Sequence, residues 1–260
     1  MGGGALILSG KFGLILLLSQ SLLLSQSLAA HAAEMKIIAS TGVASVVTEL
    51  GQKFEAKTGH KVQTDFAVIA VSKRKIDAGA AFDIAVLGPA AIDELIEQDK
   101  IVRDTRTGFG RTGLGVAARK RGAKPDISSV EAFKRAMLAA KSVCHSKEGL
   151  SGVHFLAILD RLGIAAEMKP KLKAYEGGFV QAIATDEVEL FVTGIGPILA
   201  APSAEFIGAL PKELQTYVVF TAGVATSTND LAASRALLQF MTGPDAAPVF
   251  KARGMERETK

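Results

Sequence analysis

Apolar and polar positions repeat with two different periods along the chain. Residues 35–40 (MKIIAS) form a short run rich in apolar side chains, which is typical of a buried strand. In residues 42–59, apolar side chains recur at i, i+3, i+4, i+7 and i+11 from Val43 to Phe54, which predicts a helix. Gly59 stands where this helix should end, because glycine readily adopts the left-handed conformation found after a helix C-terminus.

The same alternation continues to the C-terminus. Further strands are expected at residues 61–68, 82–88, 114–120, 143–146, 188–194, 205–211 and 216–225. Further helices are expected at residues 72–79, 90–100, 126–142, 151–163 and 179–187, from residue 196 onward, and as a pair broken at Gly243-Pro244 within residues 230–254. Strands joined by helices of this length predict an α/β fold with mixed, mostly parallel sheets covered by helices on both faces.

The chain is expected to pass between two α/β halves twice. We place the first crossover near residues 113–118 and the return near residues 217–225. The predicted domain I therefore comprises residues 33–116 and 222–260, and the predicted domain II comprises residues 117–221.

The first 32 residues have a different composition. Lys11 is their only formal charge, and the apolar stretch that follows it is interrupted by Ser-Gln pairs and ends in the small residues Ala30 and Ala32. A membrane anchor needs about 20 unbroken apolar residues. Residues 1–32 are therefore predicted to be a cleaved secretory signal peptide that directs the protein to the periplasm.

Composition narrows the possible partners and cofactors. The formal net charge of +4 is spread along the chain without a basic tract, so no nucleic-acid partner is expected, whereas a positive surplus suits small anions. Cys144 is the only cysteine, which excludes a disulfide within the chain and disfavours a cysteine metal site. We expect Cys144 to be a buried residue of a strand. No nucleotide-binding or nucleophile-elbow motif is present, and no cofactor or metal is expected.

Small and hydroxyl-bearing residues stand where predicted strands give way to helices. In open α/β sheets, ligands bind beyond the carboxyl ends of the strands, where helix N-termini offer backbone N–H groups to anions. An N-capping role without a ligand is the alternative for each hydroxyl. The candidate ligand-binding residues at these junctions are Ser40, Thr41, Gly42, Ser72, Ser151, Gly152 and Thr193.

Charged and titratable candidates lie close to these junctions. Lys73 and Arg74 follow the second junction, and Arg74 is preferred because a guanidinium can hold a carboxylate through two hydrogen bonds. His145 ends a predicted strand and His154 lies one turn into the next helix. Each histidine is interpreted either as a capped or surface side chain or as a ligand contact or proton shuttle, since imidazole titrates near neutral pH.

The order of these elements resembles a known family. The chain is similar to the type II periplasmic solute-binding proteins of ABC transporters, a group that includes the molybdate-binding proteins. This resemblance implies a two-domain, periplasmic-binding-protein-like clamp that closes over a small anionic ligand and presents it, as a monomer, to an ABC permease. The stretches that carry it are KIIASTGVASVVTELGQKFEAKTGHKV, KIDAGAAFDIAVLG, SGVHFLAILDRLGI and LLQFMTGPDAAPVFKARGME.

Two of three ligand-binding positions depart from the molybdate binders in this group. Those proteins hold the oxyanion with a serine at the first junction, a serine at the second and a late tyrosine. Here the first junction keeps Ser40 or Thr41, the second has no serine before Ser72, and the late position is aligned with Thr193. A tetrahedral oxyanion would lose two hydrogen-bond donors here, and removing an anion from water without compensating hydrogen bonds is costly. Lys73, Arg74 and the histidines suit an organic carboxylate better, so an organic carboxylate is the expected ligand.

A second hypothesis makes the same scaffold an enzyme. It also resembles that of the periplasmic aconitate isomerases, which move a proton and a double bond in a tricarboxylate. Such chemistry needs a cationic grip and a general base near neutral pH. Under this hypothesis, Arg74 would hold the substrate and His145 or His154 would transfer the proton.

Overall fold

The computed structural model describes residues 1–3, 32–122, 124–176, 179–184 and 188–258. The predicted signal peptide therefore lies almost entirely outside the described residues. No helix in the described part of the chain is long and apolar enough to cross a membrane.

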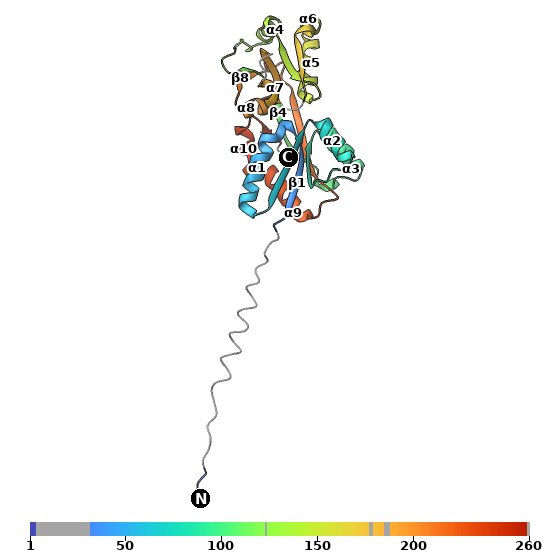
Figure 1. Cartoon of the computed structure of the whole chain (residues 1–260), viewed down its shortest axis with the longest axis vertical. Coiled ribbons are helices and arrows are strands. Elements are labelled where there is room, and N and C mark those ends of the chain that lie inside the picture. Colours follow the sequence, from blue (N-terminus) through green and yellow to red (C-terminus); the bar gives the residue numbers. More distant parts are fainter. Residues whose placement is uncertain (4–31, 123, 177–178, 185–187, 259–260) are drawn as a thin grey trace. The chain divides into compact units, whose positions relative to one another are not determined.

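From Glu34 onward, most strands are followed by a helix (Figure 1). The strands are β1 (Glu34–Ser40), β2 (Lys61–Ala67), β3 (Ile84–Leu87), β4 (Thr107–Arg119), β5 (Val143–Ser146), β6 (Leu172–Tyr175), β7 (Leu190–Gly194), β8 (Ala204–Ala209), β9 (Tyr217–Val224) and β10 (Glu256–Arg257). The α-helices are α1 (Ala44–Thr58), α2 (Ile69–Asp77), α3 (Pro89–Glu97), α4 (Val130–Ala139), α5 (Leu150–Arg161), α6 (Ala165–Met168), α7 (Phe179–Ile183), α8 (Ile195–Ala200), α9 (Leu231–Thr242) and α10 (Ala247–Ala252). Single 3-10 turns are η1 (Thr41–Val43), η2 (Arg103–Thr105), η3 (Lys169–Lys171) and η4 (Pro244–Ala246).

The sheet is mixed, and its strand order is β2-β1-β3-β9-β4-β7-β5-β6, with β8 and β10 paired to β4. Strands β1, β2 and β3 pair in parallel, as do β5, β6 and β7. Every antiparallel pair between described strands involves β4 or β9. This arrangement confirms the predicted α/β fold, with two parallel groups joined through β4 and β9.

Strand β4 links the two parallel groups. It pairs with β9 as far as Gly113 and with β7 from Leu114 onward. At this point the side-chain amide of Gln215 pairs with the backbone of Leu114 as a neighbouring strand would. Leu114 N–H donates to Gln215 Oε1 (2.8 Å), and Gln215 Nε2 donates to the Leu114 carbonyl (3.0 Å). The pairing thus changes within the region expected for the first crossover, whereas the domain limits themselves stay a prediction.

The first half of β4 was not expected from the pattern, which placed a strand only at residues 114–120. Glycine at positions 108, 110 and 113 interrupts the apolar signal there. At Gly110 the glycine is required by packing, because an added Cβ would lie 2.6 Å from Phe250 Cε1 and 2.7 Å from the Glu256 carbonyl oxygen. Glycine at this position therefore weakens the strand pattern in the sequence, but it allows α10 and β10 to pack against β4.

Helices cover both faces of the first parallel group. Ile37 belongs to the cluster that contains Leu50 of α1, whereas the next residue, Ile38, packs with Ile76 of α2 and Ile92 of α3. Successive side chains along a strand point to opposite faces, so β1 is buried on both sides and its carboxyl end opens onto η1.

Cys144 lies where the sequence placed it, in the buried strand β5. It packs with Phe179 and Phe191 in a separate cluster of the second parallel group. Burial raises the pKa of the Cys144 thiol to about 11, which leaves it protonated and unreactive at neutral pH.

Candidate functional site

A cavity of about 740 Å³ lies between the two parallel groups. Its wall includes η1 and the N-terminus of α2 from the first group, and the loop before α5 together with the ends of β6 and β7 from the second. Six predicted residues line it: Ser40, Thr41, Gly42, Arg74, Ser151 and Thr193. The rule that ligands sit beyond the carboxyl ends of strands thus locates the cavity.

The first junction is a tight turn at the cavity wall. Ser40 is 5% exposed, and its hydroxyl accepts a hydrogen bond from Gly42 N–H at 3.2 Å. A Cβ added to Gly42 would lie 2.6 Å from Cζ of Phe220, which also lines the cavity. Ser40 therefore caps η1 while Gly42 allows the turn to pack against an aromatic wall.

Two long helices direct uncapped N-termini to the cavity. Val68 and Gly149 are the N-cap residues of α2 and α5, and neither makes a side-chain capping bond. Both residues line the cavity, from opposite parallel groups. Unpaired N–H groups and the helix dipole make such ends favourable for negative charge.

A chain of hydroxyl groups forms part of the second wall. Tyr175 Oη lies 3.1 Å from Thr193 Oγ1, which lies 3.4 Å from Ser151 Oγ. Burial raises the pKa of the Tyr175 hydroxyl to about 12, so it is neutral at physiological pH and keeps a proton to donate. These three hydroxyl groups can donate hydrogen bonds to an anion without adding charge to the cavity.

Tyr175 and Ser146 line the cavity but were not predicted. Tyr175 ends β6, a four-residue edge strand whose pattern (LKAY) alternates too briefly to be recognised. Ser146 ends β5 and accepts a hydrogen bond from Gly149 N–H at 2.9 Å. Both are hydroxyl-bearing residues at the end of a strand, which is the same pattern that predicted Ser40 and Thr193.

Arg74 faces an acidic residue of the other parallel group. Its Nη2 lies 3.6 Å from Oε2 of Glu148, and the two side chains are 65% and 46% exposed. Arg74 is the only Lys, Arg or His among the described residues that line the cavity. A long contact between two solvated groups is weak, so the guanidinium is available to another carboxylate.

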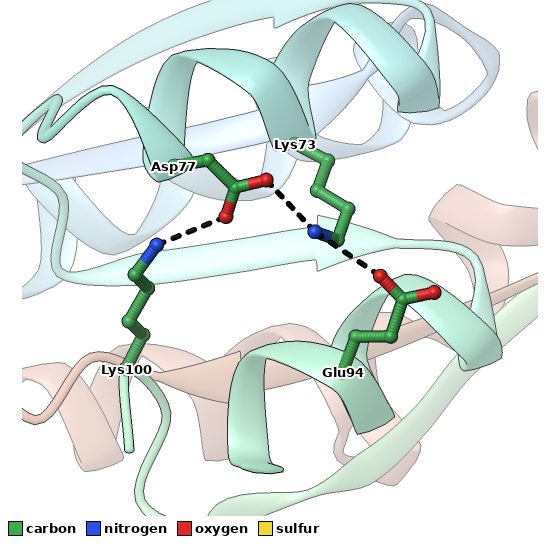
Figure 2. Close-up of polar contacts among 4 residues, drawn as sticks. All are labelled: Lys73, Asp77, Glu94 and Lys100. Atoms are coloured by element: carbon green, nitrogen blue, oxygen red, sulfur yellow. Dashed lines mark hydrogen bonds and ion pairs between the residues drawn. The ribbon is translucent and has the colours of Figure 1, made fainter. Parts of the chain in front are cut away.

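Lys73 does not reach the cavity, in contrast to the expectation. Figure 2 shows its ammonium between Asp77 Oδ2 (2.8 Å) and Glu94 Oε2 (3.1 Å), while Asp77 also binds Lys100 at 2.9 Å. The hydrogen bond to Asp77, and to a smaller extent the one to Glu94, raises the pKa of Lys73. Lys73 therefore joins α2 to α3, and we leave it out of the site.

Ser72 and Gly152 also lie behind the cavity wall. Ser72 is fully buried, and its hydroxyl is directed to the carbonyls of Ala39 (3.5 Å) and Ala67 (3.4 Å). Gly152 packs against the backbone of Ser146, where a Cβ would clash with the carbonyl oxygen. Both residues pack within the protein, and neither lines the cavity.

Neither candidate histidine lines the cavity. His145 is 7% exposed, and its Nδ1 lies 2.9 Å from the Ser146 carbonyl oxygen. His154 Nδ1 is buried without a partner among the described residues, and burial lowers the pKa of the ring. The described residues also include no group of three or more His, Cys, Asp or Glu side chains that could hold a metal ion.

Comparison with known proteins agrees with this architecture. An aconitate isomerase from a Pseudomonas species is 25% identical over 251 residues, which cover 94% of each chain. The molybdate-binding protein ModA of Azotobacter vinelandii is 26% identical over 235 residues, covering 87% of this chain and 91% of that protein. The solved structure of the periplasmic molybdate-binding protein from A. vinelandii has a TM-score of 0.73 at 18% identity and covers 86% of this chain and 100% of that one.

A family model covers almost the whole of the compact part of the chain. The model described as bacterial extracellular solute-binding protein matches residues 35–256. Together with the mixed sheet and the cavity between its two parallel groups, this match shows that the chain belongs to the bacterial extracellular solute-binding proteins, with the type II fold of the ABC-transporter binding proteins.

Proposed function

We propose that this protein captures a small organic carboxylate in the cavity and delivers it to an ABC permease in the periplasm. Domain I (residues 33–116 and 222–260) and domain II (residues 117–221) would close over the ligand, which stabilises closure because it contacts both. The proposed contacts are Ser40, Thr41, Gly42 and Arg74 from one side and Ser151, Tyr175 and Thr193 from the other.

The observation that carries the proposal is the meeting of Arg74 with two uncapped helix N-termini on one cavity. The N-termini of α2 and α5 approach the cavity from opposite sides. In neither helix does the N-cap side chain accept a hydrogen bond from the backbone N–H groups of the first turn. A guanidinium and backbone N–H groups are the donors that best match a carboxylate. They supply the hydrogen bonds that repay its loss of water.

The rest of the wall favours an organic anion over a bare oxyanion. Phe66, Phe179 and Phe220 line the cavity, so a large part of its surface is apolar. Aromatic walls gain free energy by covering carbon atoms, which molybdate and sulfate do not have. A cavity of about 740 Å³ also leaves room for a carbon skeleton beside the carboxylate.

A thermal-shift screen against oxyanions and mono-, di- and tricarboxylates tests this function. A ligand present at about 100 times its Kd should add about 2.7 kcal/mol to the free energy of unfolding. For a domain of this size, each kcal/mol raises Tm by about 2–4 °C, so a carboxylate ligand should shift it by several degrees. A shift with molybdate or sulfate alone would replace the carboxylate by an oxyanion, and no shift with any anion would refute the proposal.

Aconitate isomerisation is the second candidate function, favoured by the relative that aligns over 94% of both chains. The histidines do not line the cavity, so the base would have to be another group. Glu148 is a carboxylate of the wall that faces Arg74. Incubation with cis- or trans-aconitate, followed by ultraviolet absorbance, should show interconversion that is lost in Glu148→Gln; unchanged spectra at high protein concentration would exclude this activity.

A further inference from the structure

The charged groups on the cavity wall are unequal in number. Among the described lining residues, Arg74 carries the only positive charge, whereas Glu148 and Glu176 each carry a negative one. The lining therefore has a net formal charge of −1, although the whole chain is positive. This balance is unexpected for a cavity that captures anions, and it limits which anions can enter.

The two carboxylates are not equivalent. Glu176 Oε1 accepts from the ammonium of Lys147 at 2.5 Å, and this hydrogen bond lowers the pKa of Glu176. Lys147 is not a lining residue, so the charge of Glu176 is balanced from outside the cavity. Glu148 instead depends on Arg74, at the longer distance of 3.6 Å. Among the described residues, the ion pair of Glu148 within 4 Å is therefore the one with Arg74, the cation that a ligand would need.

Binding of one ligand carboxylate to Arg74 would displace Glu148 from its partner. The wall would then present one satisfied guanidinium and one unpaired carboxylate. A second carboxylate on the ligand would meet the negative charge of Glu148, and like charges repel at short range even where water partly screens them. The hydroxyl chain of Tyr175, Thr193 and Ser151 can bind uncharged oxygen atoms of the ligand at no such cost.

We propose that Glu148 is a specificity-determining residue that restricts the cavity to ligands with a single carboxylate. This inference rests on the proposed binding of an organic carboxylate and narrows it to monocarboxylates with an apolar or hydroxyl-bearing body. Glu148 acts in two ways: it competes weakly for Arg74 before binding, and it repels a second negative charge afterwards. The second effect distinguishes mono- from polycarboxylates.

Calorimetric titration with butyrate, succinate and tricarballylate at low, fixed ionic strength tests the inference. The wild-type protein should bind butyrate about fivefold or more tightly than succinate, and tricarballylate most weakly. Glu148→Gln should strengthen succinate binding about tenfold but butyrate binding only about threefold, since the monocarboxylate gains only from lost competition. Because Glu148 is 46% exposed, the variant should fold normally, which a denaturation midpoint verifies.

Glu176→Gln is the matched control, because it removes the same charge from the same cavity wall. Its carboxylate is already paired with Lys147, so the preference for butyrate over succinate should change less than at Glu148. Tighter wild-type binding of succinate or tricarballylate would overturn the inference and leave the proposed function standing. An equal gain for all three acids in Glu148→Gln would also overturn it, and failure of every acid to bind any form of the protein would overturn both proposals.

Discussion

Replacement of Arg74 by glutamine is expected to weaken carboxylate binding about tenfold or more, a loss of about 1.4 kcal/mol or more in binding free energy. Arg74 is the only cationic side chain among the described lining residues, and its sole ion-pair partner there is the loosely held Glu148. A glutamine amide keeps some hydrogen-bonding capacity but neither the charge nor the paired N–H geometry of a guanidinium. The helix N-termini would remain and would account for residual affinity.

Lys75→Gln is the control for Arg74→Gln, because it removes one positive charge from the same helix. The Lys75 ammonium lies 2.7 Å from Asp65 and does not line the cavity. Titration of both variants with the acid identified by thermal shift should give weaker binding only at Arg74. Equal losses would mean that long-range charge, not contact, attracts the ligand; unchanged affinity at Arg74 would mean that another group holds the carboxylate.

The sequence predicted elements whose local pattern and burial agree. Helix α1 was expected from its apolar spacing, and its C-cap residue is Gly59, which has φ of 78° in the left-handed region. The break between α9 and α10 falls at Gly243-Pro244, as the dipeptide indicates. Elements that depend on distant partners were not expected: β6 is a short edge strand, and the need for Gly110 in the first half of β4 comes from Phe250 and β10, which lie far away in the sequence.

Prediction of the site depended on where each helix begins. Placing α2 at residue 72 made Ser72 its N-cap and a ligand donor. The helix begins at Ile69 instead, so Ser72 lies within it and is buried against the ends of β1 and β2. The same shift separates neighbouring residues: Lys73 turns to Asp77 and Glu94, whereas Arg74 lines the cavity. Residues on a helix differ in direction by about 100° per position, so helix phase decides which cation can act.

Gly152 was expected to be a ligand-binding residue, but in the structure it lets α5 approach β5. We therefore expect Gly152→Ala to lower the free energy of unfolding by about 2–4 kcal/mol, the cost of forcing atoms into a well-packed site. The added Cβ would overlap the Ser146 carbonyl oxygen and lie 3.2 Å from His145 Nδ1. Backbone atoms cannot rotate away as a side chain can, so α5 or the end of β5 must move. Denaturation with urea, monitored by circular dichroism, measures the loss.

Gly51→Ala is the control, because it shows the effect of replacing a helical glycine by alanine without a clash against backbone atoms. Gly51 is also inside a helix, but its nearest contact is the Val62 side chain, with Cγ1 at 3.3 Å from an added Cβ. Alanine is favoured over glycine in a helix interior by about 1 kcal/mol, so this variant should be as stable as the wild type or slightly more so. Ser146, Gly149 and Ser151 line the cavity around this contact, so a shift of α5 in Gly152→Ala should weaken ligand binding along with folding. If Gly152→Ala were as stable as Gly51→Ala, α5 would not be pressed against β5, and the N-terminus of α5 would not be held rigidly at the cavity wall.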